Sequence, residues 1–86
     1  MSAGVLANLE AIETTLDGTI THTLKRKSRR IILTNDSGSA DLKFKFNSSE
    51  DFATLKPTES MDEYLWVREV RLSTSTSVAY RLWVYG

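Results

Sequence analysis

The sequence predicts a mostly β fold: a small antiparallel β-sandwich or barrel of about six or seven strands, with an N-terminal helix or arm. From Thr19 onward, polar and apolar residues alternate with the period of two that a half-buried strand shows. Turn-forming segments interrupt this alternation about every ten residues, a spacing typical of sandwiches and barrels. Residues 1–17 differ, because all eight aromatic residues lie between Phe44 and Tyr85. We therefore divide the chain into a helix or arm over residues 1–18 and an antiparallel sandwich over residues 19–86.

The N-terminal segment has the apolar spacing of an amphipathic helix. Its apolar residues follow one another at intervals of four, three and four: Val5, Leu9, Ile12 and Leu16. This is one stripe of a helix and also a short heptad seam, and Gly18 provides a stop. A helix of about four turns is marginal alone, so its stripe must be buried. Burial against the protein's own sheet and docking on a neighbouring subunit both remain open.

The predicted strands of the β domain are residues 19–24, 30–34, 42–46, 52–55, 64–72 and 78–85. In residues 42–46 the leucine and the phenylalanines are expected to face inward and both lysines outward. Arg68 interrupts the apolar face of residues 64–72, which predicts a bulge or a bend there. The segments 35–39 and 56–60 have strong turn chemistry, the second around Pro57.

The last predicted strand carries large apolar groups on both faces. Tyr80 and Leu82 alternate with Trp83 and Tyr85, and one face of a sandwich strand points into the core. Either the protein's own chain covers the second face, or Trp83 and Tyr85 meet a partner. Trp and Tyr are enriched at protein interfaces.

Composition excludes several classes of function. Eleven basic and eleven acidic residues balance, which argues against a protein that coats nucleic acid or an anionic membrane. The absence of cysteine excludes disulfides and thiolate metal sites. We expect no membrane span and no secretory leader. A chain of 86 residues without disulfides or a metal is marginal as a monomer, which favours association with other polypeptides.

The residues that could carry catalysis are few. The one imidazole, His22, lies in a threonine-rich strand and is interpreted as structural. Asp36 and Asp41 flank a turn, but calcium loops normally supply more ligands at regular spacing. No nucleophile elbow, phosphate loop or His-x-x-x-His spacing occurs. We therefore expect no enzyme activity, no cofactor, no bound metal and no small-molecule substrate.

The strongest charge feature is the segment 25–30, with five cations in six residues. It could be a solvated connection between strands, or it could meet phosphate or an acidic partner surface. Residues 19–46 hold seven bases and two acids, whereas residues 47–86 hold six acids and four bases. Oppositely charged patches favour packing against identical copies. Nucleic acid is an unlikely partner on this reasoning, because the basic and aromatic residues are separated in the sequence.

Three stretches resemble small all-β virion structural proteins of tailed bacteriophages, of the decoration (cement) or head–tail type. They are residues 31–38 leading into 42–46, the Leu-Lys-Pro-Thr-Glu-Ser turn at 55–60, and residues 79–83 after a Ser/Thr loop. Thr58 replaces the glycine usual in such turns. The resemblance implies a virion protein, assembled in the host cytoplasm, that binds as an oligomer on a capsid or connector surface without a cofactor.

The function predicted from the sequence is a non-enzymatic structural subunit that contacts copies of itself and a virion protein such as the major capsid protein. The expected contact residues are Val5, Leu9, Ile12, Leu16, Lys25, Arg26, Lys27, Arg29, Arg30, Trp83 and Tyr85. One alternative is a carbohydrate- or receptor-binding sandwich in which Trp66, Trp83, Tyr80 or Tyr85 stacks on a sugar. Another is a small nucleic-acid-binding barrel that uses the segment 25–30.

Overall fold

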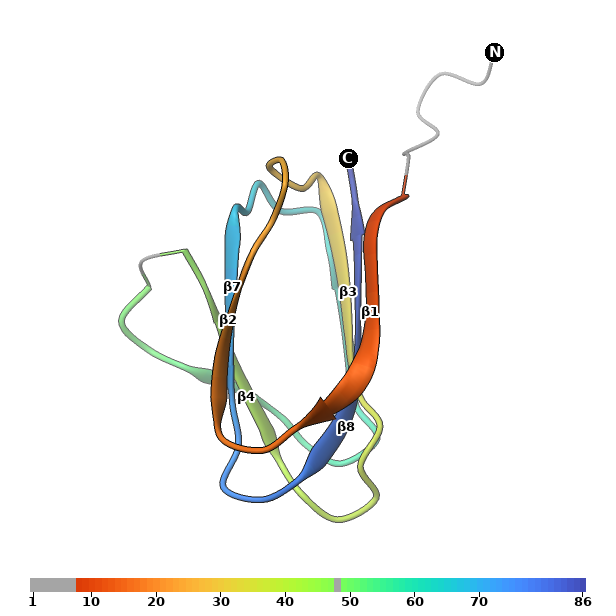
Figure 1. Ribbon diagram of the computed structural model, residues 1–86, viewed down its shortest axis with the longest axis vertical. Helices are drawn as coiled ribbons and strands as arrows, with labels where there is room; N and C mark the ends of the chain where they lie inside the picture. Colours follow the sequence, from red (N-terminus) through yellow and green to blue (C-terminus); the bar gives the residue numbers. More distant parts are fainter. Residues whose placement is uncertain (1–7, 48) are drawn as a thin grey trace.

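The computed structural model describes residues 8–47 and 49–86, which form two four-stranded antiparallel sheets facing each other (Figure 1). The strands are β1 (Asn8–Leu16), β2 (Thr19–Thr23), β3 (Arg30–Asn35), β4 (Leu42–Phe46), β5 (Ala53–Leu55), β6 (Ser60–Glu63), β7 (Glu69–Ser73) and β8 (Val78–Tyr85). One sheet has the order β1-β8-β3-β6 and the other β2-β7-β4-β5. The predicted antiparallel all-β fold is confirmed.

The strand order is that of a jelly roll, a double-sheet architecture with two Greek keys. Every connection except β4–β5 passes from one sheet to the other. The β2–β3 and β6–β7 connections therefore lie at one end of the sandwich, together with the C-terminal end of β8 (Figure 1, top). The β1–β2, β3–β4 and β7–β8 connections lie at the opposite end.

Strict alternation places the core between the sheets. In β8 the even-numbered residues Val78, Tyr80, Leu82 and Val84 are all buried, while the odd-numbered residues point away from the core. The inward residues of β3, β4 and β7 complete the core with Leu24 and Val67 from the connections. As expected, Phe44 and Phe46 pack against this core.

The predicted N-terminal helix is wrong, because residues 8–16 form β1 and pair with β8. Ile12 and Leu16 are four residues apart, so they share one face of a strand as well as one face of a helix. Leu9 is three residues from Ile12 and would face the other way in a regular strand. A register shift between Asn8 and Glu10 accompanies its packing against the core. Val5 lies outside the described residues.

The described residues form eight strands, not six or seven. The additional strands are β1 and the short β6, which pairs with β3. The predicted strand over 64–72 is shorter, because residues 64–68 form the connection that precedes β7. The interruption predicted at Arg68 falls at this boundary. The described residues contain no helix, and thus no helix that could cross a membrane.

Two predicted turns join the sheets at the lower end of Figure 1. Asn35 is fully buried at the end of β3, and its Nδ2 donates to the carbonyl oxygens of Ala40, Leu55 and Lys56 at 2.8, 3.0 and 3.2 Å. In the turn after β5, Thr58 has a φ of 68°, the left-handed conformation that glycine normally supplies. Thr58 therefore adopts the backbone conformation for which such turns normally use glycine, and this conformation is strained for threonine.

Candidate interaction surfaces

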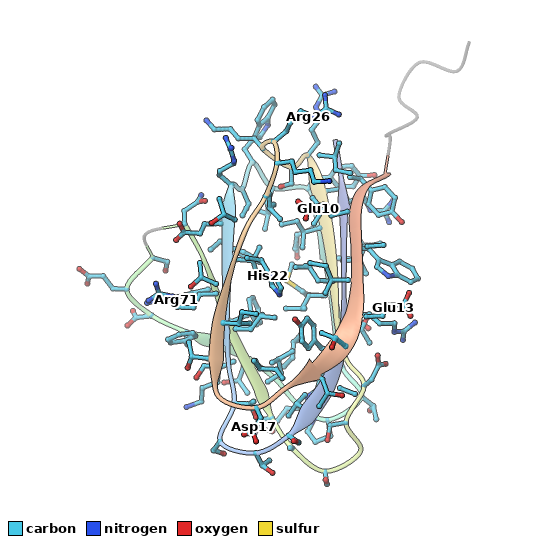
Figure 2. The ribbon with its side chains drawn as sticks, in the orientation of Figure 1. Glu10, Glu13, Asp17, His22, Arg26 and Arg71 are labelled. Atoms are coloured by element: carbon cyan, nitrogen blue, oxygen red, sulfur yellow. The ribbon has the colours of Figure 1, made fainter. Side chains whose placement is uncertain are left out.

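A histidine and a tyrosine form a polar pair in the space between the sheets. His22 points inward from β2 (Figure 2), and its Nε2 lies 2.8 Å from the Tyr80 hydroxyl. Burial lowers the pKa of His22, although the negative charge of Glu10 partly opposes this effect. Burial also raises the pKa of Tyr80. The two side chains therefore satisfy each other as neutral groups within the core.

The carboxylates considered as calcium ligands lie in separate ion pairs. Asp36 accepts two hydrogen bonds from Arg81, both at 2.9 Å, and Asp41 Oδ2 lies 3.8 Å from Lys56 Nζ. Across residues 8–47 and 49–86, no group of three or more His, Asp or Glu side chains is placed to hold a metal. Asp41 also borders an open depression, together with Lys43, Ser73, Thr74 and Ser75.

The outer face of the β1-β8-β3-β6 sheet carries a row of apolar groups. Ala11 on β1 and Ile32 on β3 stand directly opposite Trp83 on β8, one on each side. Tyr85 follows on the same face of β8. We call Ala11, Ile32, Trp83 and Tyr85 the aromatic sheet face. Trp83 and Tyr85, both predicted as contact residues, therefore point away from the core.

Trp83 is the centre of the aromatic sheet face, and its polar atom is unsatisfied. The Nε1 atom of the indole is shielded from solvent and has no hydrogen-bond acceptor among the described residues. The Arg81 guanidinium lies over the ring, 5.6 Å from its centroid. A buried donor without a partner costs about 1–3 kcal/mol. The described residues therefore do not satisfy this N–H.

The two arginines beside the aromatic sheet face are each paired with a carboxylate. Arg30 donates to both carboxylate oxygens of Asp62 at 2.8 and 2.6 Å, and Arg81 binds Asp36 in the same two-bond manner. The hydrogen bonds to Arg30 lower the pKa of Asp62, and those to Asp36 raise the pKa of Arg81. Glu13, which stands opposite Arg81 on β1, adds one exposed carboxylate to the same face.

Three other predicted contact residues face the opposite way. Leu16 is buried in the core, and Leu9 and Ile12 pack against it. The same stripe that predicted a docking helix therefore covers the protein's own sheets. Tyr80, proposed as a sugar-stacking ring, is 1% exposed and its hydroxyl is bound to His22. It is a core residue, and that part of the carbohydrate-binding alternative is wrong.

The basic segment occupies the connection between β2 and β3, at the upper end of Figure 2 where Arg26 is labelled. Lys25, Arg26, Lys27 and Arg29 are exposed, whereas Arg30 begins β3 and is half-buried. Among the described residues, no carboxylate lies within ion-pair distance of the four exposed cations. These four cations therefore have no side-chain ion pair among the described residues, although the Glu10 carboxylate accepts a hydrogen bond from the backbone N–H of Lys25 at 3.1 Å.

The fold brings two aromatic rings to this basic connection. Trp66 is 67% exposed and Tyr64 is 71% exposed, both in the β6–β7 connection. The Arg29 guanidinium lies 5.6 Å from the Trp66 centroid, and the Arg30 guanidinium lies 5.4 Å from that of Tyr64. Basic and aromatic residues are thus separated only in the sequence. We call Lys25, Arg26, Lys27, Arg29, Tyr64 and Trp66 the basic tip.

Sequence reasoning identified the cations of the basic tip but not its rings as a group. Tyr64 and Trp66 alternate with Leu65 and Val67, a pattern interpreted as a strand with the two rings on one face and Leu65 and Val67 on the other. Leu65 packs against the core and Val67 is buried within it. The rings are on the outward positions, and this same alternation was the signal that could have located them.

No protein-family model and no curated protein matches this chain. Similar solved structures include a protein of unknown function from Vibrio parahaemolyticus, with 20% identity and a TM-score of 0.62, covering 85% of this chain and 72% of that one. A DUF1255 protein of unknown function from Acidithiobacillus ferrooxidans has 20% identity and a TM-score of 0.51; the coverage is 79% of this chain and 59% of that one.

A third similar structure is Drosophila melanogaster CENP-C bound to CAL1, with 10% identity and a TM-score of 0.51, covering 99% of this chain and 83% of that one. At these identities the three likenesses establish the fold alone. They carry no activity or substrate over to this chain.

Proposed function

We propose that the protein is a non-enzymatic structural subunit that associates with a second copy of itself through the aromatic sheet face. The observation that carries the proposal is Trp83, a large ring on the central strand of the sheet, pointing outward with a shielded N–H that lacks an acceptor. Trp, Tyr and Arg residues near the centre of an interface often contribute most of its binding energy.

Two further observations support a contact between identical copies. The ion pairs of Arg30 and Arg81 compensate both arginines beside Trp83, which reduces the repulsion when the same surface meets itself across a two-fold axis. A standard interface buries about 800 Å² per partner, against a total accessible surface of 5251 Å². CENP-C, a protein of similar fold, was solved bound to a protein partner, so this architecture is compatible with protein binding.

The resemblance to all-β proteins of tailed bacteriophages provides the setting that we propose for this association. In that setting the protein is a capsid decoration subunit or another minor head or tail subunit, and its partners are its own copies and a virion protein such as the major capsid protein. A decoration protein is present in many copies on each particle, so its stoichiometry in purified particles tests this part of the proposal separately.

The association is tested by multi-angle light scattering on the purified full chain and on Trp83→Ala. We expect the wild-type chain to be larger than a monomer and Trp83→Ala to dissociate more readily by about 2–4 kcal/mol, with an unchanged circular dichroism spectrum. Arg71→Ala is the matched control, because Arg71 is an exposed residue of the other sheet. It should leave the mass unchanged.

A second variant lacking residues 1–7 separates the two ways of covering Trp83. If the wild-type chain and the chain lacking residues 1–7 are both monomers at high concentration, the self-association is wrong. If Trp83→Ala lowers the mass no more than Arg71→Ala does, the interface lies elsewhere. If deletion of residues 1–7 turns a monomer into an oligomer, those residues oppose self-association in the free protein.

A further inference from the structure

We propose that the basic tip binds single-stranded nucleic acid. The relevant surface is the end of the sandwich where the β2–β3 and β6–β7 connections meet (Figures 1 and 2). It is separate from the centre of the aromatic sheet face, and its binding does not depend on self-association. The inference rests on how the two connections are held, on what they display, and on which ligand uses both cations and rings.

The two connections are fastened together by hydrogen bonds. The backbone N–H of Leu24 donates to the Arg68 carbonyl at 2.7 Å, and that of Ser28 donates to the Val67 carbonyl at 2.8 Å. The buried Ser28 hydroxyl also donates to the Leu65 carbonyl and accepts from the Val67 N–H. The tip is therefore held in one arrangement before any ligand arrives, which reduces the entropy cost of binding.

These hydrogen bonds determine which side chains of the two connections are exposed. Leu24 and Ser28 are turned inward on one connection, so Lys25, Arg26 and Lys27 between them are exposed. Val67 is turned inward on the other connection, with Leu65 packed against the core, so the rings beside them are outside. The result is a surface on which cations and rings lie side by side.

Arg29 and Arg30 are the cations of this region that lie against the aromatic rings. The Arg29 guanidinium lies over Trp66, and Arg30 lies between Tyr64 at 5.4 Å and Tyr85 at 6.0 Å. Arg30 is already paired with Asp62, whereas Arg29 has no carboxylate within ion-pair distance among the described residues. Arg29 can therefore bind a phosphate while its neighbour Trp66 offers a ring face to a base.

Single strands use both features of the basic tip. Proteins that bind them combine cations along the backbone with aromatic rings on which successive bases stack. A duplex hides its base faces, so the exposed rings would gain little from it. An acidic polypeptide would use the cations and leave both rings in water. The 67% and 71% exposure of the rings therefore favours a ligand with flat, accessible bases.

The test is fluorescence anisotropy with a labelled 20-nucleotide oligo-dT and, in parallel, oligo-U. If the four exposed cations each meet a phosphate, the logarithmic salt slope should be about −2.8, so a rise from 50 to 200 mM salt should weaken binding about 50-fold. Trp66→Ala should weaken binding by about 5- to 150-fold, the value of one stacked base. Arg29→Gln should reduce the magnitude of the slope by about 0.7.

Phe52→Ala is the matched control for the ring. Phe52 is also an exposed aromatic residue beside a cation, with Lys45 Nζ 4.7 Å from its centroid, but it lies in the β4–β5 connection. The variant Phe52→Ala should bind oligo-dT with the same affinity as the wild-type protein. Light scattering on Trp66→Ala should give the wild-type mass, so a loss of nucleic-acid binding is distinguishable from a loss of self-association.

Competition identifies the ligand class. Duplex DNA and poly-glutamate should each displace the labelled oligonucleotide at least tenfold less well than unlabelled oligo-dT. Equal displacement by poly-glutamate would overturn the proposal in favour of an acidic protein surface. Equal binding by Trp66→Ala and Phe52→Ala would also overturn it, because the rings would then contribute nothing specific. Absence of binding by the wild-type chain at 50 mM salt would end it directly.

Discussion

The two sides of the β1-β8-β3-β6 sheet differ in how completely they are satisfied. On the inner side, Asn35 donates to three carbonyls and His22 and Tyr80 bind each other. On the outer side, Trp83 has a shielded Nε1 atom without an acceptor among the described residues. Both sides belong to the same strands and follow the same alternation. The inner polar groups are thus satisfied within one chain, and the outer face is the one for which we propose a partner.

The comparison predicts that neighbouring residues of β8 have very different roles. Leu82 is fully buried, whereas Trp83 next to it points outward. Leu82→Ala should lower the free energy of unfolding by about 2–5 kcal/mol, through lost burial and the cavity that remains. Urea denaturation at a concentration where the protein is monomeric measures this change.

Trp83→Ala is the matched variant in the same experiment. Trp83→Ala should lower the free energy of unfolding by less than half as much as Leu82→Ala, because the monomer loses only the contacts of a half-buried ring. An equal loss for the two variants would make Trp83 a core residue and remove the distinction between the two sides.

The next largest effect is expected at the buried polar residue Asn35. Asn35→Ala removes the donor to Ala40, Leu55 and Lys56, and the acceptor of the Ser37 N–H. These groups would be left without partners, so we expect a loss of about 1–3 kcal/mol in the free energy of unfolding. Thermal melting measures it.

The control for Asn35→Ala is Thr34→Ala, at the neighbouring outward position. The hydroxyl of Thr34 bonds to that of Ser60 in an exposed pair, where water can replace the lost partner. A loss below about 0.5 kcal/mol is therefore expected. If Asn35→Ala and Thr34→Ala had the same melting temperature, the hydrogen bonds of Asn35 would not stabilise the turn as the structure indicates.

The strands were predictable from the sequence wherever alternation was clean. Strand β4 and the last strand, β8, have the predicted bounds because apolar and polar residues alternate without interruption. The N-terminal segment was not predictable, because a spacing of four fits both a strand and a helix and only the pairing with β8 decides between them. Its β-branched residues Ile12, Thr14 and Thr15 were the local indication of a strand.

The candidate surfaces show the same division between local and long-range information. The outward position of Trp83 and Tyr85 follows from alternation within one strand, so it was predictable as one of two alternatives. The neighbourhood of Arg29 and Trp66 was not, because 37 residues separate them in the sequence and the hydrogen bonds between two connections bring them together. A count of aromatic residues near the basic segment could not have found it.

The smallest predicted effect concerns the pH dependence of the inner side. Burial lowers the pKa of His22 below the ordinary value of 6.5 for this side chain. As the pH falls through 6.5, the unfolded chain therefore takes up a proton that the folded protein resists, and stability decreases. The contribution of neutral His22 to the free energy of unfolding is complete above pH 6.5. It is lost as the pH falls toward the lowered pKa that His22 has in the folded protein. Because the chain has one histidine, the melting temperature should fall between pH 7.5 and pH 5.5, and less so in His22→Gln. An equal fall in both proteins would show that His22 is as accessible to protons as an outer-face residue, and the contrast between the two sides would not extend to charge.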